Sequence, residues 1–125
     1  MSTTESISIE FSPPLTADQW NQLLTRVVAP ELGQNLRRQT RRYPVTGEAR
    51  IVFEKGGKIH KRSFDVLNVS RGGMTIKGYD EVKPDTIIEL KIVLGAHSAP
   101  LKARVVHCTG TLGGFKIGVK ILFDK

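Results

Sequence analysis

Residues 49–68, A-R-I-V-F-E-K-G-G-K-I-H-K-R-S-F-D-V-L-N, decide the fold that we expect for this chain. The first six residues place Ile51 and Phe53 on one face, which is the period of a β-strand. The tetrapeptide Lys55-Gly56-Gly57-Lys58 favours a tight turn, because paired glycines readily take the positive φ angles of hairpin turns. Residues 59–68 would form the return strand. The stretch therefore predicts an antiparallel β-hairpin.

The chain after residue 73 has the same texture. In 86–94, for example, Ile88, Leu90 and Ile92 alternate with charged side chains. Short strands at regular spacing, separated by Gly-rich turns, are typical of barrels and sandwiches. We favour a closed barrel, since the chain has few aromatic side chains to cover exposed sheet edges. The segments that we expect as strands are Ala49–Glu54, Ile59–Asn68, Met74–Lys77, Thr86–Leu94, Leu101–Cys108 and Phe115–Phe123.

In two of these strands, one further residue is a candidate to extend the apolar, core-facing side. Phe64 and Val66 share one face of the second strand, and Val69 is a candidate to join them. The alternating apolar residues of Leu101–Val105 share one face of the fifth strand, and His107 is a candidate to extend that face. Residues 95–100 and 109–114 are expected to be the turns on either side of the fifth strand.

One amphipathic helix is predicted before the strands, over about Ala17–Val28. Thr16 and Gln19 stand at capping-box spacing, and Pro30 with Gly33 would end the helix. Its apolar stripe consists of Trp20, Leu23, Leu24, Val27 and Val28. We expect the stripe to pack on the barrel or cover one open end of it. The alternative is a dimer or partner surface anchored by Trp20.

The domain organisation follows from these elements. Residues 1–35 form an N-terminal extension with the amphipathic helix, and residues 36–125 form the β-barrel domain. Within the extension, residues 1–14 are expected to be a tail or an added strand. Residues 34–47 are polar and basic without a period, so we expect a linker that ends in a turn before the first strand.

Composition and charge limit the class of protein. The chain has 125 residues, one cysteine, no apolar run long enough to span a bilayer and no secretory signal at its start, so we expect a cytoplasmic protein. Residues 1–35 carry one basic and four acidic side chains, a net charge of −3, whereas residues 36–125 carry eighteen and eight, a net charge of +10. The positive field favours anionic partners, including nucleotides, nucleic acids, acidic proteins and anionic lipids.

Two short motifs carry candidate binding chemistry. Arg37, Arg38, Arg41 and Arg42 cluster in the linker, and guanidinium groups pair bidentately with phosphate oxygens or with the O6 and N7 edge of guanine. Residues 68–73, N-V-S-R-G-G, combine short polar side chains that cap a turn with glycines that let a ligand approach the backbone. Each motif alone favours the plainer interpretation, a basic linker for the arginines and an ordinary turn for residues 68–73.

Taken together, the motifs resemble the PilZ domain family. The family pattern Arg-x-x-x-Arg, followed by Asp/Asn-x-Ser-x-x-Gly, matches Arg38 and Arg42, then Asn68, Ser70 and Gly73. The flanks agree as well, because the segments 103–106 and 115–120 look like the family's last two strands. The resemblance covers roughly residues 36–123. It implies a six-stranded antiparallel β-barrel that binds the bacterial second messenger cyclic di-GMP.

The resemblance also implies roles for individual residues. Arg38 and Arg42 would grip phosphates and guanine edges, and Asn68 and Ser70 would bond a guanine and orient the loop. Gly72 and Gly73 would let the backbone approach the ligand. A basic residue at the place of Arg37 tends to accompany two stacked ligand molecules in the family. Many members carry Asp where this chain has Asn68, and an amide offers guanine fewer acceptors than a carboxylate, so we expect an effect on affinity.

These observations lead to one main hypothesis and two alternatives. The main hypothesis is a non-enzymatic cyclic di-GMP receptor or adaptor that changes conformation and regulates a protein partner in motility, adhesion or exopolysaccharide pathways. The alternatives are a small basic barrel that binds nucleic acid, which we consider unlikely because few aromatic side chains are exposed, and a PilZ interaction subunit without ligand. We predict no catalytic residue, metal site or cofactor, since His60, His97, His107 and Cys108 lack the required spacing.

Overall fold

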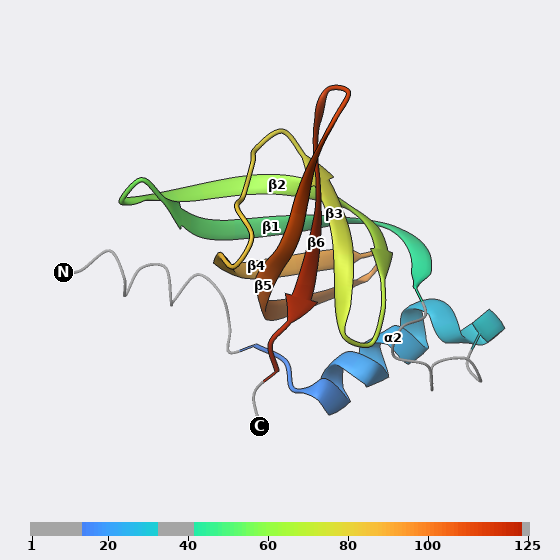
Figure 1. Ribbon diagram of the computed structural model, residues 1–125. Coiled ribbons are helices and arrows are strands. Elements are labelled where there is room, and N and C mark those ends of the chain that lie inside the picture. Colours follow the sequence, from blue (N-terminus) through green and yellow to red (C-terminus); the bar gives the residue numbers. More distant parts are fainter. Residues whose placement is uncertain (1–13, 33–41, 124–125) are drawn as a thin grey trace.

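The computed structural model of the chain describes residues 14–32 and 42–123. Within these residues, one helix precedes six strands that close into a barrel (Figure 1). The elements are α2 (Ala17–Leu32), β1 (Tyr43–Lys55), β2 (Lys58–Val69), β3 (Gly73–Gly78), β4 (Ile87–Leu94), β5 (His97–Thr111) and β6 (Gly114–Ile121). Residues 1–13 of the expected tail (residues 1–14) and residues 33–41, which include most of the arginine cluster, lie outside the described residues.

The strands follow each other around the barrel in the order β1-β2-β3-β6-β5-β4, and every neighbouring pair is antiparallel. The prediction of a six-stranded antiparallel barrel is therefore confirmed. The β1–β2 hairpin turns where the sequence predicts it, with Lys55 paired to Lys58. Gly56 and Gly57 take φ angles of 63° and 76°, which residues with a Cβ atom rarely adopt.

Strand alternation builds the core. In β4 the apolar residues Ile88, Leu90 and Ile92 are at most 1% exposed, while Lys91 between them faces solvent. Apolar residues from all six strands and from α2 form a buried cluster inside the barrel. The largest fully buried side chains include Trp20, Tyr43, Phe64, Leu24, Ile51, Met74 and Ile76. The helix thus contributes to the same core as the strands.

The first strand begins earlier than predicted. We expected residues 43–47 to belong to a linker, but β1 starts at Tyr43, whose ring is buried and whose backbone pairs with Val69. A register shift between Pro44 and Gly47 accommodates the proline in the ladder. Gly47 is required there, because a Cβ would overlap the backbone oxygen of Val93. The prediction of a turn at this point was wrong for this reason.

The fifth strand is also longer than predicted. β5 runs from His97 to Thr111, so the turns that flank it are Gly95-Ala96 and Leu112-Gly113. Gly95 and Gly113 take φ angles of 62° and 84°, and each supports a two-residue hairpin. The long hairpin of β5 and β6 projects from the end of the barrel away from α2 (Figure 1).

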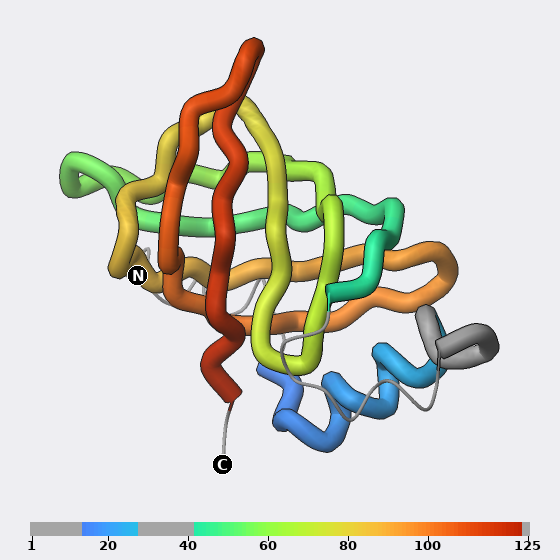
Figure 2. Tube along the Cα trace, turned by 45° about the vertical axis from the view of Figure 1, so that its right-hand side comes forward, coloured from blue at the N-terminus to red at the C-terminus, as the bar shows by residue number. Residues whose placement is uncertain are grey.

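Helix α2 lies across the other end of the barrel, below the turn between β2 and β3 (Figure 2). Its capping box is formed as predicted: the backbone N–H of Gln19 donates to Thr16 Oγ1 at 3.2 Å, and that of Thr16 to Gln19 Oε1 at 3.0 Å. Trp20 and Leu24 are fully buried against the barrel, and Leu23 and Val27 are partly buried beside them, which confirms the expected packing for these four residues of the stripe. The side chain of Val28 lies outside the described part of the structure. The helix continues to Leu32, so Pro30 does not end it.

Candidate functional site

The described part of the predicted site lies at the end of the barrel that α2 covers. Arg42 immediately precedes β1, Asn68 is near the end of β2, and Ser70 and Gly72 lie between β2 and β3. Gly73 begins β3. The fold therefore brings together five of the seven residues that we predicted, from two segments separated by a full hairpin. Arg37 and Arg38 lie outside the described residues.

Arg42 is held by hydrogen bonds to side chains of two strands, β2 and β3. Its Nη1 donates to Asn68 Oδ1 at 3.0 Å and to Thr75 Oγ1 at 3.3 Å. Asn68 and Thr75 face each other across β2 and β3, so one guanidinium nitrogen bridges two strands. Within the described residues the remaining guanidinium donors of Arg42 form no hydrogen bond, so they can bind an anion. Thr75 is a site residue that the sequence motif does not reveal.

The turn from Ser70 to Gly73 is closed by its own hydrogen bonds. The Ser70 backbone N–H donates to the Gly73 carbonyl oxygen at 2.8 Å, and the Gly73 N–H donates to Ser70 Oγ at 3.1 Å. The Gly72 carbonyl accepts from Ile121 at 2.9 Å, which fastens the turn to the end of β6. A Cβ on Gly73 would overlap the Val119 backbone oxygen, so only glycine fits between β3 and β6. The motif serine thus shapes the backbone of the site.

A row of four residues crosses the outer face of the barrel beside this turn. Asn68 pairs with Thr75, Thr75 with Gly118, and Gly118 with His107, on β2, β3, β6 and β5 in turn. The His107 imidazole covers Gly118, where a Cβ would overlap the ring. The glycine therefore makes room for an aromatic wall next to Thr75.

Register shifts place both ends of this row. One shift lies between Val66 and Asn68, and the other between Val105 and His107. An extra residue in a strand reverses which face the next side chain takes, and such bulges commonly re-aim residues at functional sites. His107 accordingly faces outward, so its candidate place on the core-facing side of β5 was wrong. Val69 does join the core, because the shift before Asn68 restores it to that face.

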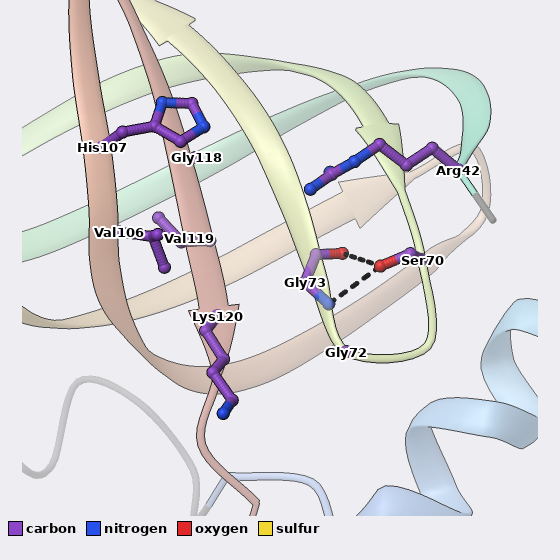
Figure 3. Close-up of a pocket in the computed structure, with 9 residues that line it drawn as sticks. All are labelled: Arg42, Ser70, Gly72, Gly73, Val106, His107, Gly118, Val119 and Lys120. Carbon is purple, nitrogen blue, oxygen red and sulfur yellow. Dashed lines mark hydrogen bonds between the residues drawn. The ribbon is translucent and has the colours of Figure 1, made fainter. Parts of the chain in front are cut away.

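These elements enclose a cavity of about 380 Å³ (Figure 3). Its lining consists of Arg42, Ser70, Gly72, Gly73, Val106, His107, Gly118, Val119 and Lys120. Arg42 reaches toward it from the β1 side, and Lys120 projects from the end of β6 (Figure 3). Within the described residues, the lining contains no carboxylate. The arrangement suits a small anion that also presents a flat polar surface.

Helix α2 contacts the back of the Ser70–Gly73 turn. The Trp20 indole Nε1 donates to the Ser70 carbonyl oxygen at 3.0 Å in a buried setting. One residue further along, Arg71 Nε donates to Asn21 Oδ1 at 3.3 Å. The helix therefore supports the backbone of the turn from the side opposite the cavity. Sequence periodicity assigned Trp20 to an apolar stripe and did not indicate this polar contact.

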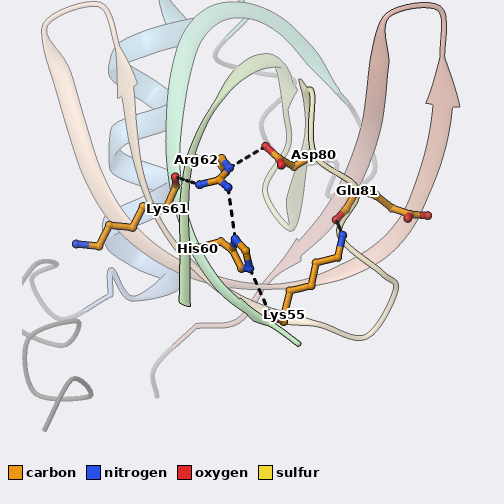
Figure 4. Close-up of polar contacts among 6 residues, drawn as sticks. All are labelled: Lys55, His60, Lys61, Arg62, Asp80 and Glu81. Carbon is orange, nitrogen blue, oxygen red and sulfur yellow. Dashed lines mark hydrogen bonds and ion pairs between the residues drawn. The ribbon is translucent and has the colours of Figure 1, made fainter. Parts of the chain in front are cut away.

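A second polar cluster secures the far end of the β1–β2 hairpin (Figure 4). Arg62 Nε forms an ion pair of 3.2 Å with Asp80, and Lys55 Nζ donates to the Glu81 carbonyl oxygen at 3.3 Å. The His60 ring stacks on Phe53 with 5.4 Å between ring centroids. These contacts join the hairpin to the loop after β3, and we assign them a structural role.

Glu48, on the outer face of β1, has a pKa below its ordinary value of 4.5. The main cause is the hydrogen bond that Ser63 Oγ donates to its carboxylate at 2.8 Å, and Arg50 contributes less. The group is partly exposed and lies on a different part of the wall from the cationic cavity.

The fold and cavity define a small antiparallel barrel with a cationic site at its helix-covered end. The PilZ domain family model matches residues 36–124. This chain therefore belongs to the PilZ domain family. None of the curated proteins matches it significantly.

Solved structures share the fold at low sequence identity. The PilZ domain of CeSA from a cellulose-synthesizing bacterium is 19% identical with a TM-score of 0.52, over 69% of this chain and 84% of that one. MrkH from K. pneumonia in complex with c-di-GMP is 15% identical with a TM-score of 0.57, over 70% of this chain and 45% of MrkH. MrkH in its apo state is 14% identical with a TM-score of 0.54, over 70% of this chain and 44% of MrkH.

The match with this chain covers less than half of the length of MrkH. The described part of the chain contains no helix of the length and apolarity that a bilayer crossing requires.

Proposed function

We propose that this chain is a receptor for cyclic di-GMP, without catalytic activity of its own. The observation that carries the proposal is the position of Arg42, whose guanidinium donates to Asn68 and Thr75 beside a cavity whose described lining contains no carboxylate. Family membership supports it, and so does the similarity in fold to MrkH, whose solved complex contains c-di-GMP.

The proposed site assigns each motif residue a task. Arg42 binds a phosphate or a guanine edge with its unused donors, and Arg37 and Arg38 add further cations from the segment before it. Asn68 keeps its amide N–H donors for the ligand, because its oxygen already accepts from Arg42. Ser70, Gly72 and Gly73 form the narrow turn that lets the ligand approach the backbone.

The signal would leave the site through α2. Trp20 contacts the backbone of Ser70, and Asn21 contacts the side chain of Arg71. A ligand that shifts this turn therefore also changes the position of the helix on the barrel. We propose that this change exposes or withdraws a surface for a cytoplasmic protein partner in motility, adhesion or exopolysaccharide pathways. Coupling of this kind requires that the ligand favours one position of the helix over another.

Isothermal titration of the purified chain with cyclic di-GMP tests the proposal, with GTP and GMP as competitors. We expect saturable binding of the cyclic dinucleotide alone, and a stoichiometry of two would support the role of Arg37. Arg42→Ala should reduce affinity at least about 100-fold, since it removes a charged bidentate contact and frees Asn68. Arg50→Ala is the matched control, because Arg50 is an exposed arginine on β1, the strand that Arg42 precedes, and lies outside the cavity.

Three results would contradict the proposal. Equal affinity of the Arg42→Ala and Arg50→Ala variants for cyclic di-GMP would show that the ligand does not bind in the cavity described above. No binding of cyclic di-GMP by the wild-type chain, together with salt-dependent binding of arbitrary single-stranded oligonucleotides, would favour a nucleic-acid-binding barrel instead. No binding of either ligand would favour a PilZ interaction subunit.

A further inference from the structure

The β6 side of the cavity carries a cation that belongs to neither motif. Lys120 lines the cavity and is exposed at the end of β6, directly opposite Gly73 in the β3–β6 ladder. On its other side it pairs with Arg104 of β5. Arg104 in turn pairs with Ile87 of β4. The row therefore reads Gly73–Lys120–Arg104–Ile87 and contains two adjacent positive charges.

This pair of cations is not neutralised within the described residues. Neither Lys120 nor Arg104 forms an ion pair there. Like charges directly opposite each other on neighbouring strands destabilise a sheet. By contrast, Lys102, two residues before Arg104, faces Glu89 across the ladder. An anion that binds beside Lys120 would relieve this repulsion, so the pair favours binding of negative charge at this point.

The geometry lets one ligand contact Lys120 and Arg42 together. In the β3–β6 ladder, the pair Gly73–Lys120 lies two residues along each strand from the pair Thr75–Gly118. The two pairs are therefore separated by about 7 Å along the strands. Arg42 is fastened to Thr75, so the guanidinium and the ammonium group border the same cavity from adjacent rows. The two side chains approach it from different directions (Figure 3).

We propose that Lys120, with Arg104 beside it, forms a phosphate subsite on the β5–β6 side of the cavity, across from Arg42. The subsite takes a phosphodiester or other phosphate group. It deepens the proposed function and rests on it for the identity of the ligand, namely a second phosphate of bound cyclic di-GMP. Lys120 makes the direct contact, and Arg104 raises the local positive potential.

Titration of four full-length proteins with cyclic di-GMP tests the subsite. Lys120→Ala should weaken binding about 10-fold, the typical worth of a hydrogen bond to a charged group. Lys120→Arg should retain most of the affinity. Lys116→Ala should stay within about twofold of wild type. Lys116 is the matched control because it is an exposed lysine on the same face of β6 but does not line the cavity. The difference between Lys120→Ala and wild type should shrink as salt is raised.

A second readout separates this inference from the proposed function. In ¹H–¹⁵N correlation spectra, pyrophosphate should shift the amide signals of Lys120 and Gly118 in the wild type, and Lys120→Ala should abolish these shifts. If cyclic di-GMP does not bind but pyrophosphate shifts these amides, the proposed function fails and the phosphate subsite stands. Equal cyclic di-GMP affinities of Lys120→Ala and Lys116→Ala overturn the subsite. So does the absence of pyrophosphate shifts in a wild type that binds no cyclic di-GMP.

Discussion

The contact between α2 and the site turn makes Trp20 the most informative residue for a stability experiment. Trp20 is fully buried, and its Nε1 donates to the Ser70 carbonyl oxygen at 3.0 Å. Replacing it by Phe keeps an aromatic ring but removes the donor and part of the ring volume. We expect about 1–3 kcal/mol from the unsatisfied buried carbonyl. The smaller ring should add about 1 kcal/mol by leaving a gap.

The expected loss in the free energy of unfolding for Trp20→Phe is therefore about 2–4 kcal/mol. In a chain of this size each kcal/mol lowers Tm by about 3–6 °C, so thermal denaturation followed by circular dichroism should show a fall on the order of 10 °C. Benzothienylalanine at the same position, which replaces only the N–H by sulfur, should reproduce the hydrogen-bond part alone. Gln22→Ala is a control at an exposed position of the same helix and should change Tm little.

Fluorescence gives an independent check, because Trp20 is the only tryptophan in the chain. A buried indole that donates to a carbonyl should emit at short wavelength and be protected from iodide quenching. A Tm that falls by less than about 2 °C in Trp20→Phe, or a solvent-exposed emission in the wild type, would refute the packing of α2 on the turn.

Two further predictions concern the outer wall of the barrel. Gly118→Ala should displace the His107 ring, because a Cβ would overlap it; the imidazole signals should shift in NMR spectra while the circular dichroism spectrum stays unchanged, and an unmoved ring would contradict the geometry. Ser63→Ala should raise the pKa of Glu48 toward 4.5, since the Ser63 hydroxyl is the main cause of its lowered pKa. Because the pKa of Glu48 is lowered in the folded chain, its carboxylate stabilises the fold above the unfolded pKa, and this stabilisation is lost as the pH falls through the folded pKa. Ser63→Ala should therefore slightly weaken the dependence of stability on pH in this acidic range. Carboxyl NMR titration measures the shift, and Arg50→Ala, which removes a lesser cause, should move the pKa less.

Local rules were sufficient for several elements of the fold. The Gly56-Gly57 turn formed where paired glycines predicted it, and the Thr16–Gln19 capping box opened the helix as its spacing indicated. Both depend on residues at most three positions apart, so neighbouring chemistry decides them. The apolar alternation of β4 likewise matched its burial.

Boundaries that depend on partners in space were predicted less well. Tyr43 begins β1 because β2 supplies its ladder partner Val69, and local signals from Pro44 and Gly47 favoured a turn instead. Helix α2 passes Pro30 and reaches Leu32. Strand β5 extends beyond the predicted ends because β4 and β6 pair with it along most of its length.

The site shows the same division between sequence and tertiary structure. The sequence by itself determined the candidate residues from Arg42 to Gly73, the barrel class and the family resemblance, because these rest on short motifs and on strand period. Only the tertiary structure decided which face Asn68 and His107 occupy, since the register shifts after Val66 and Val105 arise from pairing with other strands. It alone placed Lys120 in the cavity and Trp20 under Ser70, because those contacts join residues far apart in the chain.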